Sequence, residues 1–106
     1  MTMRRGTTPP NSFIFADEDP RDYENILVTY AQRGTLLVER DKSQLSLDET
    51  TVYLRLTQEE TLLFTAGEPV EIQIRVLRQD GTADASPIYR LPVEAVLNDT
   101  ILGGGD

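Results

Sequence analysis

Apolar and polar residues alternate along most of the chain with the period of two that is typical of β-strands. The clearest stretch is 70–77, where Val70, Ile72, Ile74 and Val76 are separated by polar residues. These apolar side chains would share one face of the strand. We expect this strand to lie in the centre of a sheet.

Shorter runs of β-branched, aromatic and alternating apolar residues predict further strands. Arg33-Gly34 and the polar cluster 48–50 mark turns, so two pairs of these runs form hairpins. The expected strands are 12–16, 25–32, 35–40, 45–47 and 52–56.

A returning strand is expected after the Asp80-Gly81 pair, which supplies the positive φ of a hairpin turn. Pro87 and Pro92 each remove an amide donor from this strand. A central strand would lose ladder hydrogen bonds at both positions, so the strand belongs at a sheet edge. A last short apolar segment covers 95–102.

One helical turn is predicted near 57–64. Thr57 and Glu60 have the spacing of a capping box, in which each side chain binds the backbone amide of the other residue. Gly67 and Pro69 would end this unit.

About seven short strands with one helical turn are typical of an all-β fold, an antiparallel two-sheet sandwich of the immunoglobulin-like type. A small open barrel would give much the same strand spacing, and it remains the alternative. The expected organisation is a flexible N-terminal arm over 1–11, a single β-sandwich domain over 12–102 and a flexible C-terminal tail over 103–106.

The charge and composition exclude several partners. The chain has 10 basic and 18 acidic residues, a net charge of -8, which disfavours nucleic acid because that contact needs Lys and Arg. It has no Cys, so a disulfide scaffold is excluded, and no apolar run long enough to span a membrane. We expect a protein that binds neither nucleic acid nor membrane.

Catalysis is disfavoured because the chain has neither His nor Cys to act as base or nucleophile near neutral pH. Lys42 lies in a polar stretch, and Glu59 and Glu60 are explained by the start of the helical turn. A hydrolase that uses carboxylates alone is the disfavoured alternative. We therefore expect no enzyme, no cofactor and no small-molecule substrate.

The segment 17–24 is strongly acidic, with Asp17 and Asp19 among its carboxylates. It lacks the ligand spacing of a calcium loop, and a solvated acidic loop explains it best. A weak cation site and a docking surface for a basic partner remain open alternatives.

Candidate contact residues lie in two places. The polar arm, with Pro9 at its end, could dock on a neighbouring molecule, and Tyr23 and Tyr89 are the best aromatic candidates. The acidic segment 17–24 is a complementary surface for the arm of another copy. The candidate protein-contact residues are Arg4, Arg5, Thr7, Thr8, Pro9, Asp17, Asp19, Tyr23 and Tyr89.

Several motifs are spread over nearly the whole chain: MRRGTTP at 3–9, VTYAQ at 28–32, LTQEETL at 56–62 and LND at 97–99. Together they resemble a set of small proteins encoded in phages and prophages of Gram-positive bacteria. Met1-Thr2 precede the shared start. The resemblance implies a protein encoded among virion structural genes, such as a tail or baseplate component, and it carries over no catalytic residue.

The first functional hypothesis is thus a phage or prophage structural protein that contacts itself or other virion proteins, made in the bacterial cytoplasm and then incorporated into the virion. The alternative is a free-standing β-sandwich module that binds a host protein or a glycan.

Overall fold

The computed structural model describes residues 2–103 and consists mainly of short strands. Its helical elements are η1 (Pro20–Asp22), η2 (Lys42–Gln44) and α1 (Gln58–Leu62). Its strands are β1 (Met3–Arg4), β2 (Pro10–Ile14), β3 (Asn25–Gln32), β4 (Thr35–Asp41), β5 (Ser46–Leu47), β6 (Thr51–Arg55), β7 (Val70–Leu77), β8 (Ala83–Ala85), β9 (Tyr89–Leu91) and β10 (Val93–Glu94).

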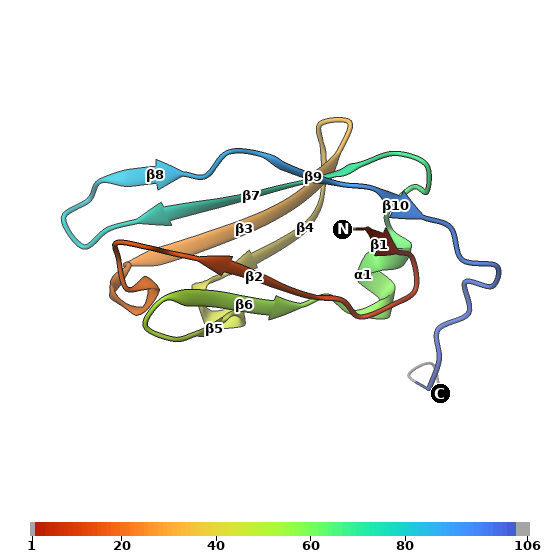
Figure 1. The fold of residues 1–106 in the computed structure, drawn as a ribbon, viewed down its shortest axis with the longest axis horizontal. Coiled ribbons are helices and arrows are strands. Elements are labelled where there is room, and N and C mark those ends of the chain that lie inside the picture. The colour runs from red at the N-terminus through yellow and green to blue at the C-terminus, as the bar shows by residue number, and fades with distance from the viewer. Residues whose placement is uncertain (1, 104–106) are drawn as a thin grey trace.

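The strands form two antiparallel sheets that pack face to face, with a small parallel pair at one end (Figure 1). One sheet has the order β2-β6-β5. The other has the order β4-β3-β7-β8, with β9 also paired to β7. The predicted all-β sandwich is therefore confirmed.

The arrangement of β7 agrees with the sequence pattern. This strand pairs with β3 on one side and with β8 and β9 on the other, so it is central. Pro87 lies between β8 and β9, and Pro92 directly follows β9. Both prolines are therefore at the edge of the sheet, as the sequence predicted. The predicted hairpins β3–β4 and β5–β6 are also present.

A single core fills the space between the sheets. The alternating residues of β7 are buried, and those of β6 face them from the other sheet. The ring of Tyr30 stacks on Phe64 with 6.2 Å between centroids, which joins β3 to the segment after α1. The buried apolar residues are Met3, Tyr23, Ile26, Val28, Tyr30, Val38, Val52, Leu54, Leu56, Phe64, Val70, Ile72, Ile74, Val76 and Val93.

The predicted helical turn is confirmed with its cap. The Thr57 hydroxyl accepts a hydrogen bond from the Glu60 amide at 3.1 Å, and the Glu60 carboxylate accepts one from the Thr57 amide at 2.8 Å. Glu60 also binds the guanidinium of Arg40 on β4. The capping residue thus ties α1 to the second sheet.

The segment predicted as an N-terminal arm differs most from the expectation. Residues 3–4 form β1, which runs parallel to β10, and the side chain of Met3 is only 2% exposed. Residues 10–14 form β2. The folded unit begins at Met3 rather than at residue 12, because Met3 is one of the apolar side chains that fill the core.

The C-terminal region contributes less regular structure than its apolar residues suggested. After β10, residues 95–102 form no strand, and Leu97 is fully exposed. Gln58 of α1 binds both the amide and the carbonyl of Leu102 through its side chain. Of the predicted tail 103–106, residues 104–106 lie outside the described range.

Candidate interaction groove

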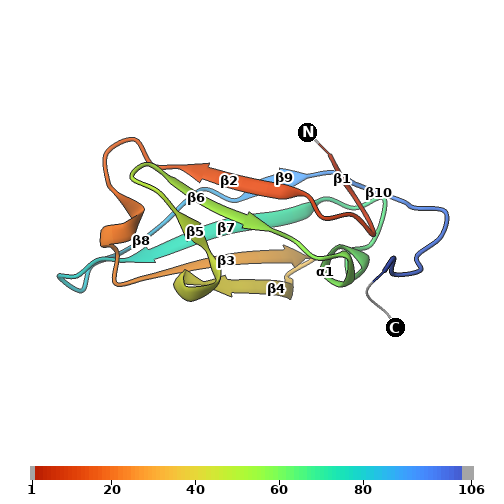
Figure 2. The same cartoon turned by 90° about the horizontal axis from the view of Figure 1, so that it is seen from below.

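An open groove of about 430 Å³ lies between the two sheets along one side of the sandwich. Its walls are β2, the edge strand of the three-stranded sheet, and the segment that joins β8 to β9 in the other sheet. Figure 2 shows β2 and β9 running along the same side of the molecule. Both sheets therefore end at this groove.

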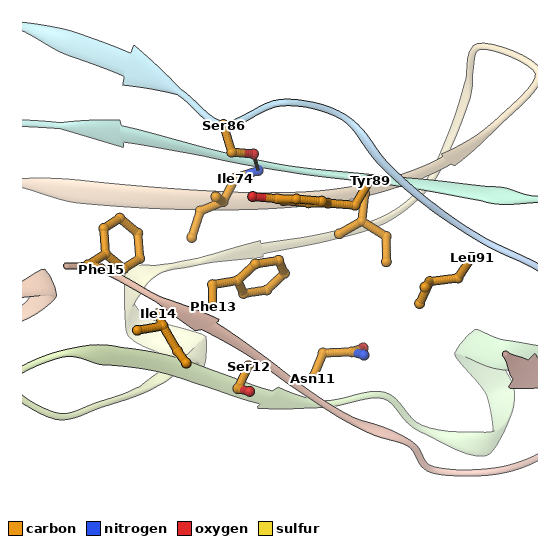
Figure 3. A pocket seen from close by; sticks show the side chains of 10 residues that line it. Asn11, Ser12, Phe13, Ile14, Phe15, Ile74, Ser86, Tyr89 and Leu91 are labelled. Carbon is orange, nitrogen blue, oxygen red and sulfur yellow. Dashed lines mark hydrogen bonds between the residues drawn. The ribbon is translucent and has the colours of Figure 1, made fainter. Parts of the chain in front are cut away.

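Strand β2 and Phe15, which follows it, direct their side chains alternately toward and away from the opposite sheet. Phe13 and Phe15 point toward the opposite sheet, whereas Ser12 and Ile14 point away from it (Figure 3). The ring of Phe13 lies 6.4 Å from that of Tyr89, between centroids. Ile14, on the outer face, is 79% exposed. The alternation of the sequence thus turns the rings of Phe13 and Phe15 inward, and within residues 2–103 no strand pairs with the free side of β2.

The opposite wall owes its shape to a break in the β7 ladder. Before Pro87, the backbone amide of Ser86 donates to the carbonyl of Ile74 at 2.9 Å, but the amide of Ile74 donates to the hydroxyl of Ser86 at 3.1 Å. The Ser86 side chain thus replaces a backbone acceptor, and the register shifts by one residue between β8 and β9. This bulge turns Tyr89, which is 46% exposed, into the groove.

The side chains of the groove are suited to contact with an apolar surface. Ile72 and Ile74 of β7 also line it. Leu91 lies at the end opposite Phe15 (Figure 3). None of the groove-lining residues is a carboxylate, Lys or Arg. The polar groups are the hydroxyls of Ser and Tyr residues and the amide of Asn11, which accepts a hydrogen bond from Tyr30 at 2.7 Å.

The backbone of β2 adds polar groups along the groove. The amide of Phe15 donates to the Thr50 carbonyl, and the Pro9 carbonyl accepts from the Leu56 amide. In an antiparallel strand, the backbone groups of every second residue point to the same neighbour. Since those of Pro9 and Phe15 point to the side of β6, those of Ser12 and Ile14 point away from it. This strand edge is available for pairing.

A charged hollow continues the groove at one end, sharing Phe15, Ile74 and Ser86 with it. Here the guanidinium of Arg78 makes two hydrogen bonds of 2.8 Å to the carboxylate of Glu18 and one of 3.2 Å to Asp84. Two carboxylates thus surround one cation.

At this end of the groove, Glu18 and Tyr23 have shifted pKa values. The hydrogen bonds from Arg78, followed by the one from the Tyr23 hydroxyl, lower the pKa of Glu18 to about 2. Burial of the Tyr23 ring, followed by its bond to Glu18, raises the pKa of that hydroxyl to about 12. Glu18 therefore remains ionised and Tyr23 neutral across the physiological range.

This arrangement predicts a loss of stability in acid. The pKa of Glu18 is lower in the folded chain than the ordinary glutamate value of 4.5, so its stabilising contribution is complete above that value. The contribution is lost as the pH falls toward about 2. Urea unfolding between pH 6 and pH 2 should show a smaller acid loss in Glu18→Gln than in the unsubstituted chain. Equal pH slopes would contradict the Arg78–Glu18 pairing.

The candidate residues of the N-terminal segment contact the domain itself. Arg4 binds Glu94 and the carbonyl of Ala95, and Arg5 binds the carbonyl of Leu62. The other three candidates use backbone carbonyls as acceptors: Thr7 binds the Thr61 hydroxyl, Thr8 the Arg55 guanidinium and Pro9 the Leu56 amide.

The candidates of the acidic segment and the aromatic candidates are separated in space. Asp17 is exposed, while Asp19 pairs with Arg21, whose hydrogen bonds lower the pKa of that carboxyl. Tyr23 is a core residue and not a surface contact, because its ring is 3% exposed and packs edge to face on Phe15. Tyr89 lies in the groove.

Of the residues that line the groove, the sequence indicated only Tyr89 as a contact residue and missed the others, among them Phe13, Phe15, Ser86 and Leu91. The signal for Phe13 and Phe15 was the alternation of β2, but the sequence could not indicate that this strand ends a sheet. Within residues 2–103, no group of three or more carboxylates is placed to hold a metal ion. The described part of the chain also has no helix long and apolar enough to cross a membrane.

Comparison with family models, with curated proteins and with solved structures finds no match for the chain.

Proposed function

We propose that the chain is a non-enzymatic structural or assembly protein of a phage or prophage, a tail, baseplate or related virion component that acts through protein–protein contacts. The observation that carries the contact role is the free edge of β2 beside an open apolar groove. Unpaired strand edges are ready templates for pairing with another chain. The assignment to a virion is supported by the resemblance of the motifs at 3–9, 28–32, 56–62 and 97–99.

The chemistry of the groove favours contact over catalysis. Its lining offers apolar surface and neutral hydroxyl and amide groups, without a carboxylate or amine to move a proton. Lys42 lies elsewhere, where its ammonium donates to the backbone carbonyls of Arg21 and Tyr23. An amine held in this way closes the loop before β3 and is not directed at a substrate.

The contact surface of this proposal is not the N-terminal segment. Arg4, Arg5 and Met3 are already engaged within the domain, so docking them on another molecule would cost the contacts that they make here. The partners are other particle proteins or a second copy, met in the bacterial cytoplasm during assembly and retained in the virion.

The direct test is the composition of particles from cells that encode the chain. After induction and density-gradient purification, quantitative mass spectrometry should find this chain in the particle fraction at a fixed ratio to the other structural proteins. Recovery only in the particle-free fraction would refute a virion role and favour the alternative, a binding module for a host protein or a glycan.

A further inference from the structure

We propose that the groove accepts one extended strand of a different protein, which pairs with the free edge of β2 and carries Lys or Arg at its N-terminal end. The inference rests on the proposed contact role and names the partner's chemistry. It follows from the backbone of the groove, from its side chains and from the charges at its end.

Of the two strand edges that border the groove, that of β2 is the more open to pairing: beyond Pro10, which has no amide, the backbone groups of Ser12 and Ile14 lie on its free side. In the opposite wall, the Ala85 amide binds the carboxylate of Asp84, Pro87 has no amide, and the Pro92 carbonyl accepts from the Met3 amide. Such features protect natural edge strands from unwanted pairing. By contrast, β2 directs the backbone groups of Ser12 and Ile14 to its free side.

A strand added to β2 would extend the three-stranded sheet over Tyr89 and Ile74. Its alternate side chains would then point between the sheets, against the rings of Phe13 and Phe15 and into the volume of about 430 Å³. Those positions require apolar residues of the incoming strand, and the intervening positions face solvent. The groove therefore selects an alternating apolar and polar strand.

The antiparallel sheet sets the direction of the incoming strand, and the charges at the end of the groove select its terminal residue. The sheet is antiparallel, and an antiparallel neighbour of β2 starts beside Phe15, where the groove reaches Glu18 and Asp84. Arg78 balances only one of these two carboxylates. A cation at the N-terminal end of the incoming strand would meet this excess of negative charge.

The same charges disfavour a second copy as the occupant. Each copy carries a net charge of -8, so two copies repel each other. The exposed apolar segment 95–102 is the obvious donor strand of a second copy, but it contains Asp99 and no Lys or Arg. A basic strand from another protein fits both the apolar and the charged part of the groove.

The test uses capped synthetic heptapeptides in which Val alternates with Thr, titrated into the full chain by calorimetry. The peptide with Lys at its N-terminal end should bind at least about tenfold more tightly than the matched peptide with Glu there. Moving the Lys to the C-terminal end should remove the advantage. Equal binding of the three peptides would overturn the assigned direction, and no binding would overturn the inference.

Ile14→Pro tests the pairing edge, because it removes an amide that points away from β6 and leaves the inner face of β2 unchanged. It should weaken binding of the Lys peptide at least about tenfold, whereas the control Ile14→Thr keeps the amide and the affinity. Unchanged binding in Ile14→Pro would overturn the pairing mode.

The double variant Glu18→Gln with Asp84→Asn tests the charged end without touching β2. It should lose most of the preference for Lys over Glu, so the inference remains testable even where Ile14→Pro lowers the thermal midpoint. A chain that oligomerises without peptide, and whose association Ile14→Pro abolishes, would show a second copy as the occupant and overturn the inference. If the unsubstituted chain enters particles but binds no strand, only the inference fails, whereas exclusion from particles refutes the proposed virion role.

Discussion

Replacing Tyr30 by Ala should lower the free energy of unfolding by about 3–5 kcal/mol, the range for large aromatic side chains in cores. Tyr30 is 0% exposed and stacks on Phe64. Its hydroxyl donates to Asn11 of β2 at 2.7 Å, so one side chain joins the sheet of β3 to the strand that borders the groove. Burial raises the pKa of this hydroxyl, which stays neutral and keeps its hydrogen bond.

Urea unfolding of two further variants separates the contribution of the buried Tyr30 ring from that of its hydroxyl hydrogen bond. Tyr30→Phe keeps the ring and removes one hydrogen bond, so it should cost about 1 kcal/mol. Tyr53→Ala removes a ring that is 43% exposed on the outer face of β6, and it should cost less than Tyr30→Ala. Equal losses in Tyr30→Ala and Tyr53→Ala would contradict the described core.

Met3→Ala should also be strongly destabilising, by about 2–5 kcal/mol, although Met3 lies near the start of the chain. The side chain of Met3 is 2% exposed in the core, and its amide donates to the carbonyl of Pro92 at 2.8 Å. Truncation therefore creates a cavity where β1 meets β10.

Thr2→Ala is the matched control, because Thr2 is exposed. Its free energy of unfolding should stay within about 0.5 kcal/mol of that of the unsubstituted chain. If Met3→Ala were as mild as Thr2→Ala, the N-terminal segment would not be part of the core.

The sequence predicted the elements whose signal is local. The alternation of 70–77 gave the central strand, the Arg33-Gly34 turn gave the first hairpin, and the spacing of Thr57 and Glu60 gave the capped helix. Pro87 marked an edge strand. Each of these signals depends on residues that are close together in the chain.

The remaining features depend on residues that are far apart in the chain. Arg4 binds Glu94 over a separation of 90 residues, and no local pattern in the polar segment 1–11 indicated a partner at the other end. Likewise, Tyr23 follows a run of carboxylates, a pattern that is typical of a loop. Phe15 covers the ring of Tyr23. Arg78 supplies the positive charge that allows the carboxylate of Glu18 to lie beside the Tyr23 hydroxyl.

The groove could not be predicted for a related reason. Phe13 and Phe15 have the pattern of an ordinary strand, and the groove exists because β2 ends its sheet above the bulge at Ser86. Strand order and the register shift after β8 are properties of the assembled sheets. A sequence pattern fixes which face of β2 is buried but not which strand lies next to it.

The central claim, that the edge of β2 is free and available to a partner, is tested most directly by amide hydrogen exchange measured by NMR on the full chain. The amides of Ser12 and Ile14 should exchange rapidly, while that of Phe15, bonded to the Thr50 carbonyl, should be protected. Adding the Lys peptide should slow exchange at Ser12 and Ile14. Protection of these two amides in the dilute chain alone, equal to that of Phe15, would contradict the account.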